Sequence, residues 1–212
     1  MEWLQSSFNL ISKGGIIMIP ILICSIVALG IIIERLIEMK GLSEDVDSLS
    51  IRVNKLLEQG NDRKALEACG QATGPIGQIY KTGLINKKCP RWKLEEKLSL
   101  TGQEQLQKLG KNIRGLEVIA AISPLMGLLG TVIGMVQAFN KVAEFKGQVN
   151  PSLLAGGIWE ALLTTAAGLA VAIPVLVMLH YFERKIENAG YLMEKNAQIL
   201  VHIFDERIPG EV

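Results

Sequence analysis

Three long stretches that lack Asp, Glu, Lys and Arg place the strongest constraint on how this 212-residue chain can fold. They run from Gly14 to Ile33, from Val118 to Asn140 and from Ala161 to Phe182. Each holds about 20 residues, the length that a helix rising about 1.5 Å per residue needs to cross a hydrocarbon layer about 30 Å thick. A soluble core that buried all three would leave almost no amphipathic segment to cover it. The sequence therefore predicts an all-α membrane protein with three transmembrane helices.

The first stretch could instead be a cleaved signal peptide, because Lys13 gives it a basic flank. However, its apolar part exceeds the roughly 7 to 15 residues typical of such peptides, and no small-residue cleavage site follows before Glu34 and Arg35. We therefore expect it to remain in the protein as a membrane anchor.

The basic residues indicate how the helices are oriented in the membrane. Of the 22 Lys and Arg residues, 15 lie between Arg35 and Arg114, and four follow the third stretch. Because Lys and Arg favour the cytoplasmic side, we expect the middle block and the tail in the cytoplasm and the N-terminus outside. The net charge of +1 excludes a strongly basic nucleic-acid-binding protein.

These observations divide the chain into seven expected segments. They are an external N-terminal segment (1–13), the first transmembrane helix (14–33), a cytoplasmic helical region (34–115), the second transmembrane helix (116–140), a short external loop (141–153), the third transmembrane helix (154–182) and a cytoplasmic helical tail (183–212).

The cytoplasmic parts are expected to be helical. Apolar spacing predicts an amphipathic helix from Leu42 to Leu57 and a shorter one from Arg63 to Cys69, followed by a turn from Gly70 to Pro75. From Trp92 a loose apolar stripe leads into the second stretch without a proline, so one continuous helix is expected there. The tail also keeps an apolar face. Such faces can be covered within one subunit or by neighbouring copies, and we expect neighbouring copies to share them in a ring-forming homo-oligomer.

The sequence does not predict an enzyme. His180 and His202 are isolated, and no nucleophile is paired with a base by its spacing. The three cysteines, Cys24, Cys69 and Cys89, have neither metal-like nor CxxC spacing. We therefore expect free thiols, no metal site and no cofactor.

Both later stretches carry a stripe of small residues. In the second stretch the stripe consists of Gly127, Thr131, Gly134 and Ala138, and Gly130 with Gly134 forms a GxxxG pattern. In the third stretch it consists of Gly157, Ala161, Thr165, Gly168 and Ala172. Small residues allow helix backbones to approach closely in lipid, so the glycines predict helix packing. We assign Pro124 and Pro174 to packing as well, and Pro174 is expected to kink its helix.

Two interpretations of the threonines remain open at this point. Thr131 and Thr165 can bond their own helix backbone as part of ordinary packing, or they can line a path between helices with Glu160 at its outer boundary. A threonine hydroxyl does not titrate at accessible pH. Apart from His180 near the end of the third stretch, no Asp, Glu, Lys, Arg or His lies in the three stretches. If ions move here, the titrating group in mid-membrane must therefore come from another protein.

Two motifs carry a family resemblance: SPLMGLLGTVIGM (Ser123 to Met135) and EALLTTAAGLAVAIP (Glu160 to Pro174). They resemble the signatures of the MotA/TolQ/ExbB proton-channel family, nearest to its ExbB and TolQ members. The resemblance implies a pentamer whose second and third helices line a pore. An ExbD- or TolR-like single-span partner would place a membrane aspartate in that pore. Thr131 and Thr165 match the threonines that face this aspartate, and Glu160 matches the acidic residue that opens the second motif.

The resemblance also implies a function. It favours an ExbB-like subunit of a proton-motive-force-driven motor in the bacterial inner membrane, with a periplasmic N-terminus and a cytoplasmic C-terminus. Together with an ExbD-like protein, such a subunit energises a TonB-like protein for import across the outer membrane. A TolQ-like subunit of the Tol-Pal envelope system and a passive membrane scaffold are the alternatives. Trp159 and Thr164 depart from the family pattern, and they can alter the outer pore or face lipid and headgroups.

Overall fold

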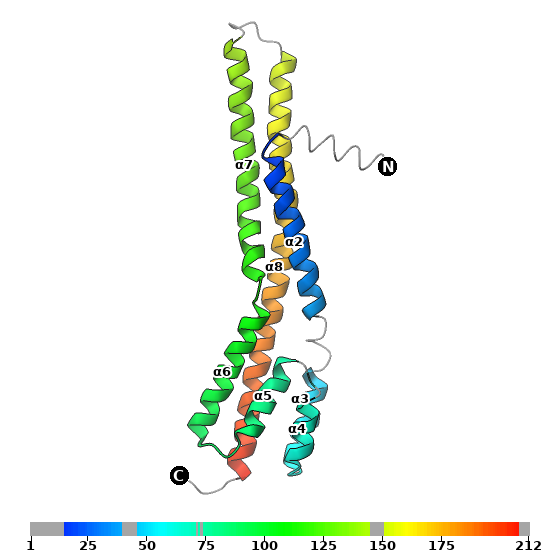
Figure 1. Cartoon of the computed structure of the whole chain (residues 1–212), viewed down its shortest axis with the longest axis vertical. Helices are drawn as coiled ribbons and strands as arrows, with labels where there is room; N and C mark the ends of the chain where they lie inside the picture. Colours follow the sequence, from blue (N-terminus) through cyan, green and yellow to red (C-terminus); the bar gives the residue numbers. More distant parts are fainter. Residues whose placement is uncertain (1–14, 40–45, 71, 73, 145–150, 208–212) are drawn as a thin grey trace, which may run out of the picture. The chain divides into compact units, whose positions relative to one another are not determined.

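The computed structural model describes residues 15–39, 46–70, 72, 74–144 and 151–207, and these residues form helices and short connections without a strand. The helices, labelled as in Figure 1, are α2 (Met18–Met39), α3 (Val46–Glu58), α4 (Asp62–Gly70), α5 (Pro75–Ile85), α6 (Arg91–Leu109), α7 (Ile113–Glu144) and α8 (Pro151–Arg207). The expected N-terminal segment 1–13 and residues 145–150 of the expected loop 141–153 lie outside the described residues, whereas residues 141–144 and 151–153 belong to α7 and α8.

The chain divides into two compact units. The first comprises residues 1–33 and 112–180, and the second comprises residues 34–111 and 181–212. Helix α8 therefore contributes its first part, up to His180, to the first unit and its remainder to the second.

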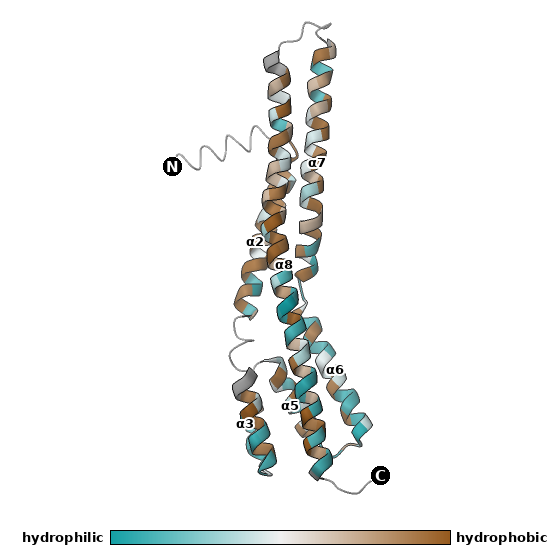
Figure 2. Cartoon of the chain, turned by 180° about the vertical axis from the view of Figure 1, so that it is seen from behind, coloured by the Kyte–Doolittle hydropathy of each residue, from teal (hydrophilic) through white to brown (hydrophobic). Residues whose placement is uncertain are grey.

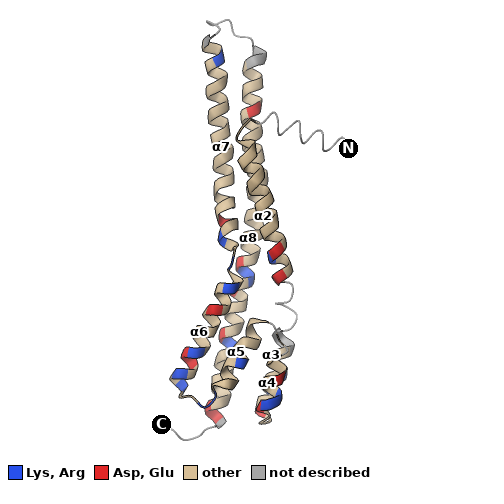
Figure 3. Ribbon diagram, viewed as in Figure 1, with Lys and Arg blue, Asp and Glu red and all other residues tan. Residues whose placement is uncertain are grey.

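Three helices are long and apolar enough to cross a membrane: Met18–Met39, Ile113–Ala143 and Leu154–Glu206. Figure 2 shows the predominantly apolar character of the helices in the first unit, and Figure 3 shows that Lys, Arg, Asp and Glu gather on the helices of the second. This finding confirms the prediction of an all-α chain with three membrane-crossing helices.

The helix expected to run without interruption from Trp92 into the second span is broken, so that prediction was wrong. Helix α6 ends at Leu109, Gly110 follows as its C-cap, and α7 begins only at Ile113. Asn112 has φ = 62°, a left-handed conformation that Asn adopts more readily than most residues and that cannot continue an α-helix. The absence of a proline from this segment was therefore not enough to predict a continuous helix.

A buried arginine completes the end of α6. The Arg35 side chain, near the end of α2, is 1% exposed, and its Nη1 donates a hydrogen bond of 3.3 Å to the Leu109 carbonyl oxygen. Helix ends leave such carbonyls without intrahelical partners. Nη1 also lies 2.9 Å from the Glu38 carboxylate, whereas Nε has no hydrogen-bond partner among the described residues.

The second unit has its own hydrophobic core. It is built from α3, α4, α5, α6 and the last part of α8, and its fully buried side chains include Val53, Leu57, Ile76, Tyr80 and Leu200. Helix α5 was not anticipated from the sequence. It begins at Pro75, directly after Gly74, because proline suits the first helical position, where no intrahelical N–H bond is lost.

Helix α5 changes the interpretation of the tail. Met193, Leu200 and Phe204 of α8 are buried in this core, and a methyl group on Gly83 of α5 would overlap the Leu200 side chain. The apolar face of the tail is thus covered within the chain. Packing within one subunit, the alternative that the sequence left open, is therefore present for this face because α5 contacts it, and the expected sharing with neighbouring copies stays a prediction.

A polar group is enclosed in the same core. The Tyr80 hydroxyl lies 2.8 Å from Oδ1 of both Asn54 and Asn196, and Asn196 in turn donates to the Leu192 carbonyl. Burial raises the pKa of Tyr80, so the phenol remains a neutral hydrogen-bonding group at physiological pH.

Candidate functional site

The small residues of α7 and α8 meet in the first unit, where the two helices run side by side (Figure 1). Their contacts show an antiparallel order, since residues later in α7 meet residues earlier in α8. The pairs are Ser123 with Gly168, Gly127 with Thr165, Gly130 with Thr164, Gly134 with Ala161, and Ala138 with Gly157. The structure thus brings together the glycines that the sequence assigned to packing.

None of these glycines has room for a side chain. A methyl group on Gly127 would lie 2.9 Å from the Thr165 Cα, and one on Gly134 would lie 2.9 Å from the Ala161 Cβ. On Gly168 it would lie 2.5 Å from the Ser123 carbonyl oxygen. Carbon atoms in ordinary contact are about 3.5–4.0 Å apart, so the absence of side chains is what permits this spacing.

The hydroxyls along the interface all bond to backbone carbonyls. Thr165 Oγ1 donates across the interface to the Gly127 carbonyl oxygen at 2.9 Å. Thr131 donates to Leu128 at 2.6 Å and Thr164 to Ala161 at 2.7 Å, both within their own helices. The backbone bonding considered for the threonines is therefore present, and for Thr165 it links two helices.

Thr131 and Thr165 lie on the same edge of the interface. Thr165 opposes Gly127, whereas Thr164 opposes Gly130 on the other side. Thr131 follows Gly127 by one helical turn, which puts its side chain on the Gly127 side of α7. Both threonines are partly exposed, and Thr131 also lines an open depression on α7. The edge formed by Thr131 and Thr165 is called the threonine edge below.

Glu160 lies elsewhere. It is five residues before Thr165, so its side chain points about 140° around α8 from that of Thr165. Because α8 begins at Pro151, Glu160 lies well inside its own helix and not at its N-terminus. Its Oε1 instead lies 2.6 Å from the position that a methyl group on Gly15 would take, and Gly15 has φ = 67°.

Both prolines assigned to packing lie inside helices that continue past them, Pro124 in α7 and Pro174 in α8. Next to Pro124, the buried Ser123 donates its hydroxyl hydrogen to the Ile119 carbonyl at 2.7 Å. The Pro174 side chain is exposed in the isolated single chain.

The two departures from the family pattern differ in their surroundings. Trp159 is exposed, as expected for a side chain that faces lipid or headgroups. Thr164 is 2% exposed and lies against Gly130, so it does not face lipid or headgroups, and an effect on the outer pore stays a prediction. Its hydroxyl fits because the facing residue has no side chain.

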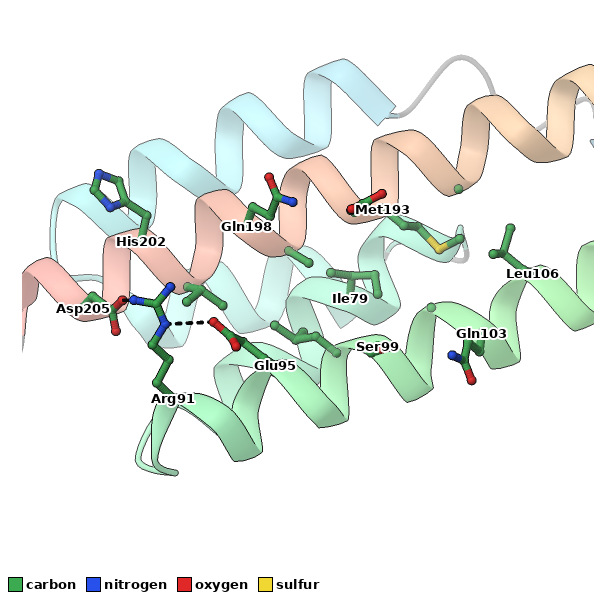
Figure 4. A pocket seen from close by; sticks show the side chains of 16 residues that line it. Ile79, Arg91, Glu95, Ser99, Gln103, Leu106, Met193, Gln198, His202 and Asp205 are labelled. Carbon is green, nitrogen blue, oxygen red and sulfur yellow. Dashed lines mark hydrogen bonds and ion pairs between the residues drawn. The ribbon is translucent and has the colours of Figure 1, made fainter.

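A second concave site lies in the second unit, in a groove of about 810 Å³ between α6 and the last part of α8 (Figure 4). Its floor is apolar and includes Ile79 and Met193. At one end Arg91 bonds both Glu95 and Asp205 at 2.8 Å. The hydrogen bond to Glu95 is the main cause that raises the pKa of Arg91. Within the described ranges no cluster of three or more His, Cys, Asp or Glu could hold a metal ion.

The chain is similar in sequence to known proteins. A model of the MotA/TolQ/ExbB proton channel family matches residues 71–195. The chain is 32% identical over 180 residues to biopolymer transport protein exbB1 of Vibrio cholerae serotype O1, a match that covers 83% of this chain and 77% of the relative. These matches confirm the family resemblance carried by the two motifs.

Further relatives bear similar names. The putative biopolymer transport protein ExbB-like 3 of Synechocystis is 28% identical over 188 residues, which cover 88% of this chain and 90% of the relative. Biopolymer transport protein ExbB of Salmonella typhimurium is 37% identical over 111 residues, which cover 52% of this chain and 43% of the relative.

Proposed function

Because the chain belongs to the MotA/TolQ/ExbB proton channel family, we propose that it is an ExbB-like subunit of a motor driven by the proton motive force. Family membership places it among membrane transport proteins and not among enzymes. In the proposed function it works in the bacterial inner membrane with an ExbD-like single-span partner. Together they energise a TonB-like protein for import across the outer membrane.

The threonine edge is the observation that carries this proposal. Thr131 and Thr165 present two partly exposed hydroxyls on one side of a tightly packed helix pair. The sequence between Val118 and Asn140 and between Ala161 and Leu179 contains no Asp, Glu, Lys, Arg or His. A path that moves protons past this edge therefore needs an acid from a second protein.

The proposed assembly is a ring, a pentamer of this chain with the threonine edges turned towards a central partner helix. Many large aliphatic side chains on the outer faces of α2, α7 and α8 are exposed in the single chain, including Ile26, Leu128 and Leu176. Such faces suit contact with lipid or with neighbouring copies. The proposed topology keeps the N-terminus in the periplasm and the tail in the cytoplasm, as the distribution of Lys and Arg favours.

Glu160 is proposed to hold the beginning of α2 and not to carry protons. Its carboxylate approaches Gly15, three residues before α2, and its direction around α8 differs from that of Thr165. A carboxylate near the start of a helix is electrostatically favourable. This assignment restricts the proposed proton path in this chain to the two threonines.

Co-purification from native membranes in mild detergent tests the function. We expect a small single-span protein with an aspartate in its span to accompany the chain. A TonB-like companion would support the import function, whereas Tol-Pal companions would replace it with the TolQ-like output. If the chain forms a stable oligomer without any acid-bearing partner, the motor proposal fails and a passive scaffold takes its place.

Thr165→Val tests the role of the site in the assembled complex. Valine keeps the shape of threonine but removes the hydroxyl, so proton-driven work should be lost while the complex stays assembled. Thr101→Val is the matched control, because Thr101 makes a similar 2.9 Å bond to the Lys97 carbonyl in α6 of the second unit. Full proton-driven activity of an intact Thr165→Val complex would refute the proposed role.

A further inference from the structure

The hydroxyl hydrogen of Thr165 is already used in a hydrogen bond to the backbone of α7. Its Oγ1 lies 2.9 Å from the Gly127 carbonyl oxygen, and a carbonyl oxygen can only accept. A threonine hydroxyl has a single hydrogen and two lone pairs. Thr165 must therefore be the donor, and only lone pairs remain for any other group that approaches its oxygen.

Thr131 is in the same situation. Its Oγ1 lies 2.6 Å from the Leu128 carbonyl oxygen, so it too donates its single hydrogen to the backbone. Thr164 and Ser123, which are buried nearby, donate to the Ala161 and Ile119 carbonyls. None of these four hydroxyls has a hydrogen left for a bound group.

We propose that the threonine edge binds hydrogen-bond donors and therefore holds the membrane acid of the partner in its protonated, neutral form. The proposal rests on the proposed function, which supplies that acid. A protonated carboxyl group has one O–H to donate to a threonine oxygen. An ionised carboxylate has none, and at the threonine edge its oxygens meet lone pairs that repel it.

The consequence is a direction for each proton transfer. While the acid contacts the threonine edge, the hydrogen bond from its O–H to a threonine oxygen favours the neutral form and raises the pKa of the acid. When the acid gives its proton to water, the O–H bond breaks and the hydrogen bond to the edge is lost with it. The threonine edge thus belongs to the step in which the acid carries a proton, and release occurs where the acid faces other groups.

The test is a titration of the partner acid in the purified complex. The complex is reconstituted in lipid nanodiscs with ¹³C-labelled aspartate in the co-purified single-span protein, and the infrared band of the protonated carboxyl group is followed against pH. A net hydrogen bond contributes about 0.5–1.5 kcal/mol, and one pKa unit corresponds to about 1.4 kcal/mol. Thr165→Val should therefore lower the pKa of the acid by up to about one unit, and Thr165→Ser should restore it.

The sign of the shift decides the proposal. Threonines that donate to the carboxylate would give the opposite result, because their loss raises the pKa. A pKa that rises or stays unchanged in Thr165→Val overturns the proposal. Thr101→Val should leave the pKa unchanged, and a shift as large as that of Thr165→Val would overturn the assignment to the threonine edge.

A second variant covers failure of the first to assemble. Thr131 bonds only within α7, so Thr131→Val leaves the contact between the helices in place and should also lower the pKa. A rise or no change there overturns the proposal in the same way. If no acid-bearing partner accompanies the chain at all, this inference and the proposed function both fall. If a partner is present but the pKa of its acid is unchanged in both Thr165→Val and Thr131→Val, the inference alone is overturned.

Discussion

Gly168→Ala should weaken the contact between α7 and α8 by an amount that can be worked out from the structure. The added methyl group would lie 2.5 Å from the Ser123 carbonyl oxygen and 3.2 Å from the Gly127 Cα. Both are backbone atoms and cannot rotate away. The helices must therefore separate locally by about 1 Å to restore ordinary contact distances.

The expected magnitude combines two losses. Overpacking of a close contact costs about 1–3 kcal/mol. Separation also stretches the 2.9 Å bond from Thr165 to Gly127, which contributes about 1 kcal/mol. The matched control is Gly156→Ala in the same helix, because no atom lies within 4 Å of its added methyl group. The gain in helix propensity is common to both variants, so their difference should be about 3 kcal/mol.

Reversible unfolding in mixed detergent micelles measures this difference. We expect Gly168→Ala to unfold at a lower fraction of denaturing detergent than the wild type, and Gly156→Ala at an equal or higher fraction. Equal stability of the two variants, within about 0.5 kcal/mol, would refute the inference that the glycine contact holds α7 and α8 together.

Other variants test the remaining features of the structure. Tyr80→Phe should lower the free energy of unfolding of the second unit by about 1–3 kcal/mol, because Asn54 and the buried Asn196 lose a hydrogen bond, whereas Tyr191→Phe at an exposed position should have little effect. Comparable losses in the two variants would contradict this role. Burial raises the pKa of Cys69 from 9.0 to about 11. Alkylation of this thiol at pH 8 should therefore be about 100-fold slower in the folded protein than in denaturant, and its rate should increase up to pH 11. Similar rates in both states would refute the burial of this thiol. Gly15→Ala should lower the midpoint of thermal unfolding by several degrees, because an alanine at φ = 67° is strained and its methyl group would meet the Glu160 carboxylate. If the clash with Glu160 adds to the backbone strain, Glu160→Ala in the same protein should recover part of that loss.

The sequence predicted three helices long and apolar enough to cross a membrane, because length and the absence of charge are properties of each segment alone. Gly127, Gly130, Gly134, Gly157 and Gly168 could also be assigned to packing, since helical periodicity places them on common faces. The pairing of these faces could not be predicted in the same way. The sequence therefore did not predict which residue Thr164 contacts, although in the structure it is buried against Gly130.

Two features of the second unit were missed for different physical reasons. Helix α5 is short, and its two glycines, Gly77 and Gly83, weaken the periodic signal even though both are needed for close contacts. The break after Leu109 depends on the left-handed conformation of Asn112, which the residue type permits but does not require. For α5, tertiary contacts outweigh local preference.

The hydrogen bond from Arg35 to the Leu109 carbonyl imposes an order on biosynthesis. The two residues are 74 positions apart, so at about 5–20 residues per second the ribosome needs roughly 4–15 s to deliver the acceptor after the donor. During that interval the guanidinium group has no native carbonyl to bind and must stay hydrated. The end of α2 can therefore reach its final, buried environment only after the helices up to α6 have been synthesised.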